Sequence, residues 1–285
     1  MSKIVVVHGI GQQNEGALTL HSRLFPALKQ GLAYGGSDIS PEDASFPCYG
    51  HLFRPEAEVL SPSPPRYDAA DVADGFEADL LHALWERAAE TDGRVLPPSE
   101  EALFRTPVWA KRALAAMSRS AFLSGVAERA FIADLKQVSA DFSDPGVRRR
   151  ALAEVRAAIT PRTRVVIGHS LGSVVAYELL STAVSDTEES SVAIPPVALV
   201  TLGSPLGLRR LVHDRLPRPG AWPDGAASWT NIADAADVVA VVEDLRPLYG
   251  GRITQIRVHN GARAHDMAPY LTDAATGRAI AEGLV

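Results

Sequence analysis

The sequence predicts an α/β protein with a mostly parallel sheet and helices on both faces. Short apolar runs of strand length alternate with longer segments whose apolar residues recur at helical spacing. This alternation favours parallel pairing, because each helical crossover returns the chain to the same end of the sheet. With 285 residues, of which 46% are hydrophobic, the chain can bury one large core. We therefore expect a single domain over residues 1–285.

The N-terminal part predicts a strand, a helix and a second strand. The apolar run Lys3–Val7 has the length of a buried strand, and leucines four residues apart predict a helix over Leu18–Ala33. Pro26 falls inside this helix, so the helix is either kinked or split in two. A second strand is expected over Ala44–Tyr49. Pro47 restricts this segment to a sheet edge or an extended loop, because proline has no N–H to donate.

The middle of the chain predicts a helical insertion at about residues 66–142. It follows a proline-rich loop, Pro55–Pro65, and is largely helical from Ala69 to Phe142. Its apolar residues exceed what one buried stripe per helix requires. Two interpretations remain open: these side chains pack the insertion onto the sheet, or part of them lines an apolar pocket for a ligand. The residues that do not all share one helix face with Leu114, Val126 and Leu135 are Trp109, Met117, Phe122, Leu123 and Phe131.

The C-terminal half returns to alternating strands and helices. Asp144 and Pro145 are an N-cap and a first helical residue, and Thr160-Pro161 ends the helix that they begin. An acidic, serine-rich loop is expected over Ser185–Ser191. The remaining elements are strands at Arg164–Ile167, Val197–Leu202, Trp229–Ala233 and Ile253–His259, and helices at Ser173–Leu180 and Asp273–Leu284.

The segment Gly168–Gly172, with the sequence GHSLG, is the most informative motif. It lies between an apolar strand and a helix-forming stretch, which is the context of a nucleophile elbow. Glycines on either side of Ser170 leave room for the strand and the helix to pack closely. The turn also places Ser170 at a helix N-terminus, where backbone N–H groups favour a developing negative charge. Ser170 is therefore the candidate nucleophile.

A serine hydroxyl needs a base to remove its proton and a carboxylate to orient that base. Asp234 and Asp237 follow one predicted strand, and either could supply the carboxylate. His259 ends the next strand and His265 lies in the glycine-containing loop before the last helix. We favour His265, because a base in that loop can reach Ser170. The order along the chain is then serine, acid, histidine.

These motifs resemble the α/β-hydrolase superfamily of lipase and esterase type. The N-terminal sequence His8-Gly9-Ile10-Gly11 is similar to the oxyanion loop of small bacterial lipases and of GPI inositol-deacylase-like hydrolases. Asp237-Val238-Val239 resembles the family's acid loop, which favours Asp237 over Asp234. The resemblance implies an α/β-hydrolase fold with a helical cap and no cofactor. It further implies these roles: Ser170 as nucleophile, His265 as base, Asp237 as acid, and the N–H groups of Ile10 and Leu171 as the oxyanion hole.

The expected activity is hydrolysis of a carboxylic ester or thioester through an acyl-enzyme. An acyltransferase or cyclase would use the same acyl-enzyme, and the difference lies in water exclusion and acceptor binding. A non-catalytic binding module on the same fold is a further alternative. The expected partner is a small acyl substrate of apolar character.

Other function classes are disfavoured by composition and pattern. The net charge of −6 gives no reason to expect a nucleic-acid partner. No apolar run approaches the ~20 residues of a membrane span, and the N-terminal run is too short for a signal peptide, so we expect a cytoplasmic protein. His21, His51, His82 and His213 show no metal-ligand spacing, so we expect no zinc site. A dinucleotide fingerprint is rejected because Asn14 stands where its third glycine would fall.

Overall fold

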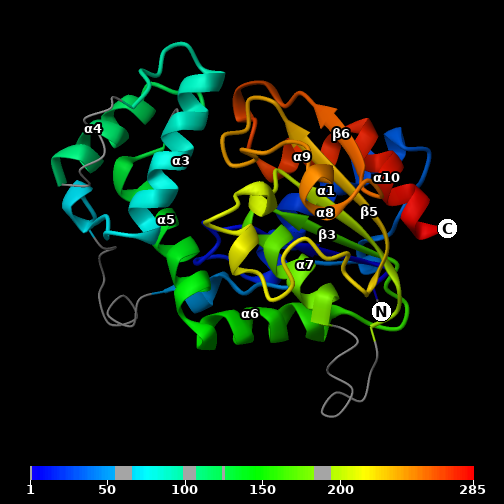
Figure 1. Cartoon of the computed structure of the whole chain (residues 1–285). Coiled ribbons are helices and arrows are strands. Elements are labelled where there is room, and N and C mark those ends of the chain that lie inside the picture. Colours follow the sequence, from blue (N-terminus) through cyan, green and yellow to red (C-terminus); the bar gives the residue numbers. More distant parts are fainter. Residues whose placement is uncertain (1, 55–65, 99–106, 124–125, 183–193) are drawn as a thin grey trace.

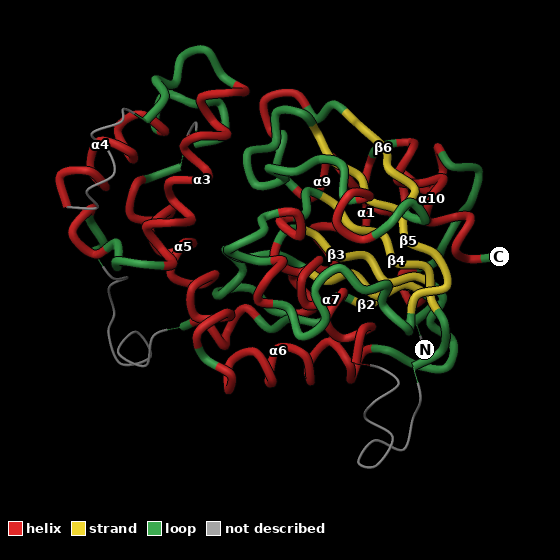
Figure 2. Tube along the Cα trace, viewed as in Figure 1, coloured by secondary structure: helices red, strands yellow, loops and turns green. Residues whose placement is uncertain are grey.

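The computed structural model describes residues 2–54, 66–98, 107–123, 126–182 and 194–285. These residues form an α/β structure around a six-stranded sheet in the order β2-β1-β3-β4-β5-β6, and every strand pair is parallel (Figures 1 and 2). The predicted parallel sheet is thereby confirmed. The strands are β1 (Ile4–Val7), β2 (Ala44–Ser45), β3 (Val165–His169), β4 (Val197–Leu202), β5 (Ala226–Asp234) and β6 (Thr254–Val258).

Helices cover both faces of this sheet, as the sequence predicts. On one face α10 packs against β3, β4 and β5, and α1 packs against α9 and α10. On the other face α7 packs against β1, β3 and β4, and α6 packs against α7. The bounds of these helices, with the short α8, are α1 (Ala17–Tyr34), α6 (Pro145–Ala158), α7 (Leu171–Thr182), α8 (Arg246–Tyr249), α9 (Met267–Thr272) and α10 (Ala274–Leu284).

The two faces of the sheet bury alternate residues of the same strands. In β1, Ile4 and Val6 belong to the hydrophobic cluster under α1 and α10. Val5 and Val7 belong to the cluster on the α7 side. Successive side chains of a strand point to opposite faces, so a strand covered on both faces must be apolar throughout. This explains why β1 is a continuous run of isoleucine and valine.

Two N-terminal expectations are refined by the structure. The helix α1 is continuous through Pro26, so it is not split in two. Pro26 is exposed, and the neighbouring Leu24 and Leu28 point into the core. The second strand was predicted over Ala44–Tyr49, but β2 covers only Ala44–Ser45 at the edge of the sheet. Pro47 follows two residues after the end of β2 and has no N–H for the ladder, which fits its restriction to an edge.

The stretch at residues 66–142 is helical where it is described. It contains α3 (Phe76–Thr91), α4 (Pro107–Met117) and α5 (Glu128–Ser143), and it enters the chain between β2 and β3. The three helices gather beside the body that contains the sheet, and α5 packs against α6 (Figure 1). The predicted loops 55–65 and 185–191 lie outside the described residues. Across the described ranges, no helix combines the length and the apolar character that a membrane crossing needs.

Candidate active site

Ser170 is the single residue between β3 and α7. Its φ is +52°, and it is the one non-glycine residue with positive φ in the described part of the chain. This left-handed conformation costs a residue with a side chain about 1–2 kcal/mol, so the surroundings must hold it. Ser170 N donates to the Leu202 carbonyl at 3.0 Å, and Ser173 donates to the Ser170 carbonyl from its N–H at 2.9 Å and its hydroxyl at 2.6 Å.

Glycines surround Ser170 because there is no space for a side chain. A Cβ on Gly168 would lie 2.5 Å from Ser173 Cα, and one on Gly172 would lie 2.3 Å from the His8 carbonyl oxygen. A Cβ on Gly9 would lie 2.7 Å from Ser170 Cβ. The elbow glycines therefore allow close backbone packing, as the sequence predicts, and Gly9 adds the loop after β1 to this packing.

The structure brings Ser170, His265 and Asp237 together. His265 Nε2 lies 3.0 Å from Ser170 Oγ, and His265 Nδ1 lies 2.9 Å from Asp237 Oδ2. The three residues are far apart in sequence and follow β3, β5 and β6, whose parallel arrangement places their ends at the same edge of the sheet. This hydrogen-bonded chain is the central geometric feature of the site.

The electrostatic environment orients the His265 ring. Asp237 is completely buried, and burial alone would raise the pKa of its carboxyl. His265, the N–H of Val239 and the hydroxyl of Tyr270 outweigh burial and leave the pKa of Asp237 below its ordinary value. The ionised Asp237 therefore accepts a hydrogen bond from Nδ1–H of His265. The lone pair of Nε2 is left facing the hydroxyl of Ser170.

The two alternative residues lie elsewhere. The side chain of His259 is 83% exposed, and its Nδ1 lies 3.9 Å from Asp234 Oδ2. Asp234 accepts hydrogen bonds from the backbone N–H groups of Ala236, at 2.7 Å, and Asn260. Asp234 thus organises the loops after β5 and β6 and has no contact with His265.

Tyr270 is a member of the site that sequence reasoning missed. Its hydroxyl donates to Asp237 Oδ2 at 2.9 Å and accepts from Asp234 N at 2.8 Å. Burial and the nearby Asp237 charge raise the pKa of Tyr270 far above its ordinary value, so the hydroxyl stays neutral and can donate. Tyr270 lies on α9, a helix that the sequence analysis did not predict.

Gly203 is a second residue without an obvious sequence signal. It follows β4 with φ +53°, and a Cβ here would lie 2.6 Å from Asp237 Oδ2 and 3.3 Å from His265 Nδ1. A side chain at this position would displace the carboxylate or the imidazole. Its place directly after a predicted strand was the available clue, since such positions meet at the functional edge of a parallel sheet.

His169 holds the backbone of the loop that carries His265. Its Nε2 lies 2.7 Å from the His265 carbonyl oxygen, and a carbonyl only accepts, so Nε2–H donates. Burial lowers the pKa of His169 to about 3, with the nearby His265 ring adding to the effect. His169 is therefore neutral near pH 7. Its hydrogen bond holds the backbone of His265 in position next to Ser170.

His8 performs a similar task for the loop after β1. Burial lowers its pKa to about 4, so the ring is neutral near pH 7. It stacks on Tyr49 with ring centroids 4.2 Å apart. Tyr49 N donates to Nε2 at 3.2 Å, which leaves the proton on Nδ1 to donate to the Gly9 carbonyl at 2.6 Å. The backbone at Gly9 is thus fixed by this hydrogen bond from His8 and by its close packing against Ser170.

Gln137 of α5 connects the insertion to the same loop. Its buried side-chain oxygen accepts from Gly11 N at 3.1 Å. Its Nε2 lies 3.3 Å from Gln13 Oε1 and 3.4 Å from Asp134 Oδ1. The contact spans 126 residues of sequence, which is why no local pattern indicates it.

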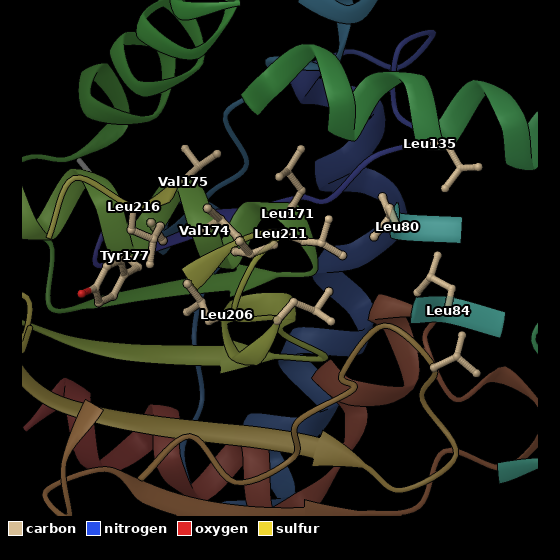
Figure 3. Close-up of a cluster of buried hydrophobic side chains, with 14 of the residues drawn as sticks. Leu80, Leu84, Leu135, Leu171, Val174, Val175, Tyr177, Leu206, Leu211 and Leu216 are labelled. Atoms are coloured by element: carbon tan, nitrogen blue, oxygen red, sulfur yellow. The ribbon is translucent and has the colours of Figure 1, made fainter. Parts of the chain in front are cut away.

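A cavity of about 610 Å³ opens beside Ser170 and His265. Ile10 and Leu171 lie in its wall, and much of the rest comes from the insertion. Figure 3 shows Leu80, Leu84 and Leu135 of the insertion on one side of Leu171. The α7 residues Val174, Val175 and Tyr177 lie on the other side. The ring of Phe122 meets the ring of His265 edge-on, with centroids 6.0 Å apart. The apolar lining includes Leu80, Leu84, Phe122, Phe131, Leu135 and Val138.

In the described ranges no group of three or more His, Cys, Asp or Glu side chains is arranged to hold a metal ion. Comparison of the chain with protein-family models, curated proteins and solved structures gives no match. The geometry around Ser170 is therefore what bears on function.

Proposed function

We propose that this protein is a serine hydrolase with an α/β-hydrolase fold that cleaves a carboxylic ester or thioester through an acyl-enzyme. The observation that carries the proposal is the continuous hydrogen-bonded chain from Ser170 Oγ through the His265 ring to Asp237. The nucleophile and the orienting acid each lie within hydrogen-bond distance of the base, one at either ring nitrogen, which is the arrangement that activates a serine. The all-parallel sheet and the order Ser170, Asp237, His265 along the chain support the fold assignment.

In this mechanism Ser170 Oγ attacks the carbonyl carbon while His265 Nε2 takes its proton. Asp237 stabilises the resulting imidazolium and keeps the ring in place. The N–H groups of Ile10 and Leu171 are suited to bind the oxyanion, since Ile10 follows Gly9 against Ser170 and Leu171 begins α7. The proton then passes to the leaving group, the C–O or C–S bond breaks, and water attacks the acyl-enzyme by the same steps.

The decisive test is covalent labelling of Ser170. We expect a fluorophosphonate probe to label the protein, because an activated serine attacks phosphorus. Ser170→Ala should abolish labelling and retain the circular dichroism spectrum of the parent. Peptide mapping of the labelled protein identifies the modified residue. Labelling of the Ser170→Ala variant at the parent's rate would show that another residue reacts.

The lining of the cavity supports an apolar acyl group. Each methylene buried from water contributes about 0.8 kcal/mol, which corresponds to about a fourfold gain per carbon. We expect kcat/KM on p-nitrophenyl esters to rise steeply from acetate to medium-length chains and to level off when the cavity is full. A series in which acetate is the best substrate and activity falls with every carbon would mean that these side chains only pack the insertion onto the sheet.

A further inference from the structure

An isolated carboxyl group lies in the wall of the otherwise largely apolar cavity. Asp134 is on α5, where Phe131, Leu135 and Val138 line the same cavity. Among the described residues its one hydrogen bond is the 3.4 Å contact from Gln137 Nε2 to Oδ1. Within the same residues no Lys or Arg forms an ion pair with it. The second oxygen, Oδ2, is thus available to a group that enters the cavity.

The placement of this carboxyl is costly for the protein alone. Burial raises the pKa of Asp134 to about 7, although the nearby His265 acts in the opposite direction. The side chain is half-buried, and a carboxyl that loses part of its contact with water while it has one long hydrogen bond destabilises the folded chain unless a partner supplies a donor. Apart from Gln137, the α5 residues beside it in the cavity wall are the apolar Phe131, Leu135 and Val138, so the helix provides no second donor. A bound ligand can provide it.

Asp134 is also close to the reacting end of the cavity. Its Oδ1 lies 3.7 Å from the position that a Cβ on Gly11 would occupy. Gln137 holds Gly11 N and contacts Asp134, so the carboxyl is fixed relative to the loop after β1. The same loop packs on Ser170 through Gly9. Ser170 and Asp134 therefore line the same cavity, and a molecule bound at Ser170 can extend to Asp134.

We propose that Asp134 binds a hydroxyl group of the substrate, so that the preferred esters combine an apolar chain with a hydroxyl on either the acyl or the alcohol part. The proposal rests on the proposed function. A hydroxyl donates to a carboxylate and exchanges donor and acceptor roles with a neutral carboxyl, so it suits both protonation states. The lining also contains Arg23 and the pair Arg263–Asp266, whose charges offset each other, so the remaining positive charge of Arg23 disfavours an ammonium group.

Paired esters test this selectivity and distinguish the two positions of the hydroxyl. The acyl pair is p-nitrophenyl octanoate and its hydroxyoctanoate analogues, and the alcohol pair is propyl octanoate and 2-hydroxyethyl octanoate. We expect the hydroxylated member of one pair to have about tenfold higher kcat/KM in the parent, and we expect Asp134→Leu to remove this ratio. Asp134→Asn, which keeps a polar side chain of the same shape, should retain part of it. Glu128→Gln changes an exposed charge on the same helix and should leave the ratio unchanged.

Equal rates within both pairs, or a hydroxyl preference that survives in Asp134→Leu, would overturn the proposal. A greater preference for 2-aminoethyl octanoate would overturn the hydroxyl proposal and assign Asp134 to a cation instead.

A binding measurement distinguishes failure of this proposal from failure of the proposed function. Ethylene glycol monooctyl ether and ethyl octyl ether cannot be hydrolysed as esters, and their thermal stabilisation of the Ser170→Ala protein does not depend on turnover. The hydroxylated ether should stabilise it more, and the difference should vanish when Asp134→Leu is added. Equal stabilisation by both ethers would contradict hydroxyl binding on the alcohol side.

Discussion

We expect His265→Ala to lower kcat for ester hydrolysis by at least about 10³-fold. The imidazole is the group that lies within 3.0 Å of Ser170 Oγ, and without it the hydroxyl has no base to accept its proton. KM should change far less, because Phe122 and the other apolar side chains of the cavity remain in place. Steady-state kinetics on a medium-chain p-nitrophenyl ester measures both parameters.

His259→Ala is the matched control for this experiment. It removes a histidine from the same region, but the side chain is 83% exposed and its Nδ1 lies 3.9 Å from Asp234 Oδ2. Its kcat should stay within about twofold of the parent, since exposed side chains away from a site have small effects. A large loss in His259→Ala together with a small loss in His265→Ala would exchange the roles of the two histidines.

The parts of the site that could be predicted from sequence are those with a local signal. Ser170 lies in a short motif whose glycines are required by backbone packing within a few residues. His265 and Asp237 follow strands, and parallel strands bring such positions to one edge of the sheet. The burial of β1 on both faces of the sheet could likewise be predicted from its unbroken apolar run.

The missed residues depend on contacts between distant segments. Tyr270 matters because its hydroxyl joins Asp234 and Asp237, and nothing in the sequence around Tyr270 indicates that bond. In the sequence, Gln137 is a polar residue on a predicted helix and has no distinguishing signal. Its hydrogen bond with Gly11 N exists because the fold brings these distant segments together. The second strand was predicted too long because Phe46–Tyr49 has apolar residues that are buried outside the sheet ladder. Tertiary packing determined these features, and local propensity could not.

The insertion and the sheet are coupled at the candidate active site. Gln137 of α5 binds the loop after β1, and Phe122 meets the ring of His265. In the proposed mechanism this loop supplies an oxyanion donor from Ile10. A displacement of α5 would therefore change the cavity and the donor geometry together. In the proposed hydrolase, this coupling would connect occupation of the cavity to the oxyanion donor beside Ser170.

Asp237→Asn should lower kcat by about 10³- to 10⁴-fold and leave the fold intact. The buried carboxylate accepts from Nδ1–H of His265 at 2.9 Å and from the Tyr270 hydroxyl at 2.9 Å. An amide removes the charge that stabilises the imidazolium. Its NH₂ can also donate to Nδ1, which would place the ring proton on Nε2 and present Ser170 with a donor in place of a base.

Asp234→Asn should lower stability and largely retain activity, the opposite of the result expected for Asp237→Asn. Asp234 accepts from the N–H of Ala236 through Oδ1 and from the N–H of Asn260 through Oδ2, whereas Asn has one acceptor oxygen and an NH₂ group that would face the other N–H. Loss of that hydrogen bond should cost about 1–3 kcal/mol of unfolding free energy. Its kcat should fall far less than that of Asp237→Asn, because Asp234 has no hydrogen bond with His265. Urea unfolding and steady-state kinetics on both variants give the comparison. If the Asp234 variant loses more activity than the Asp237 variant at equal fraction folded, Asp234 supplies the acid and the hydrogen bond from His265 to Asp237 is not the one that supports catalysis.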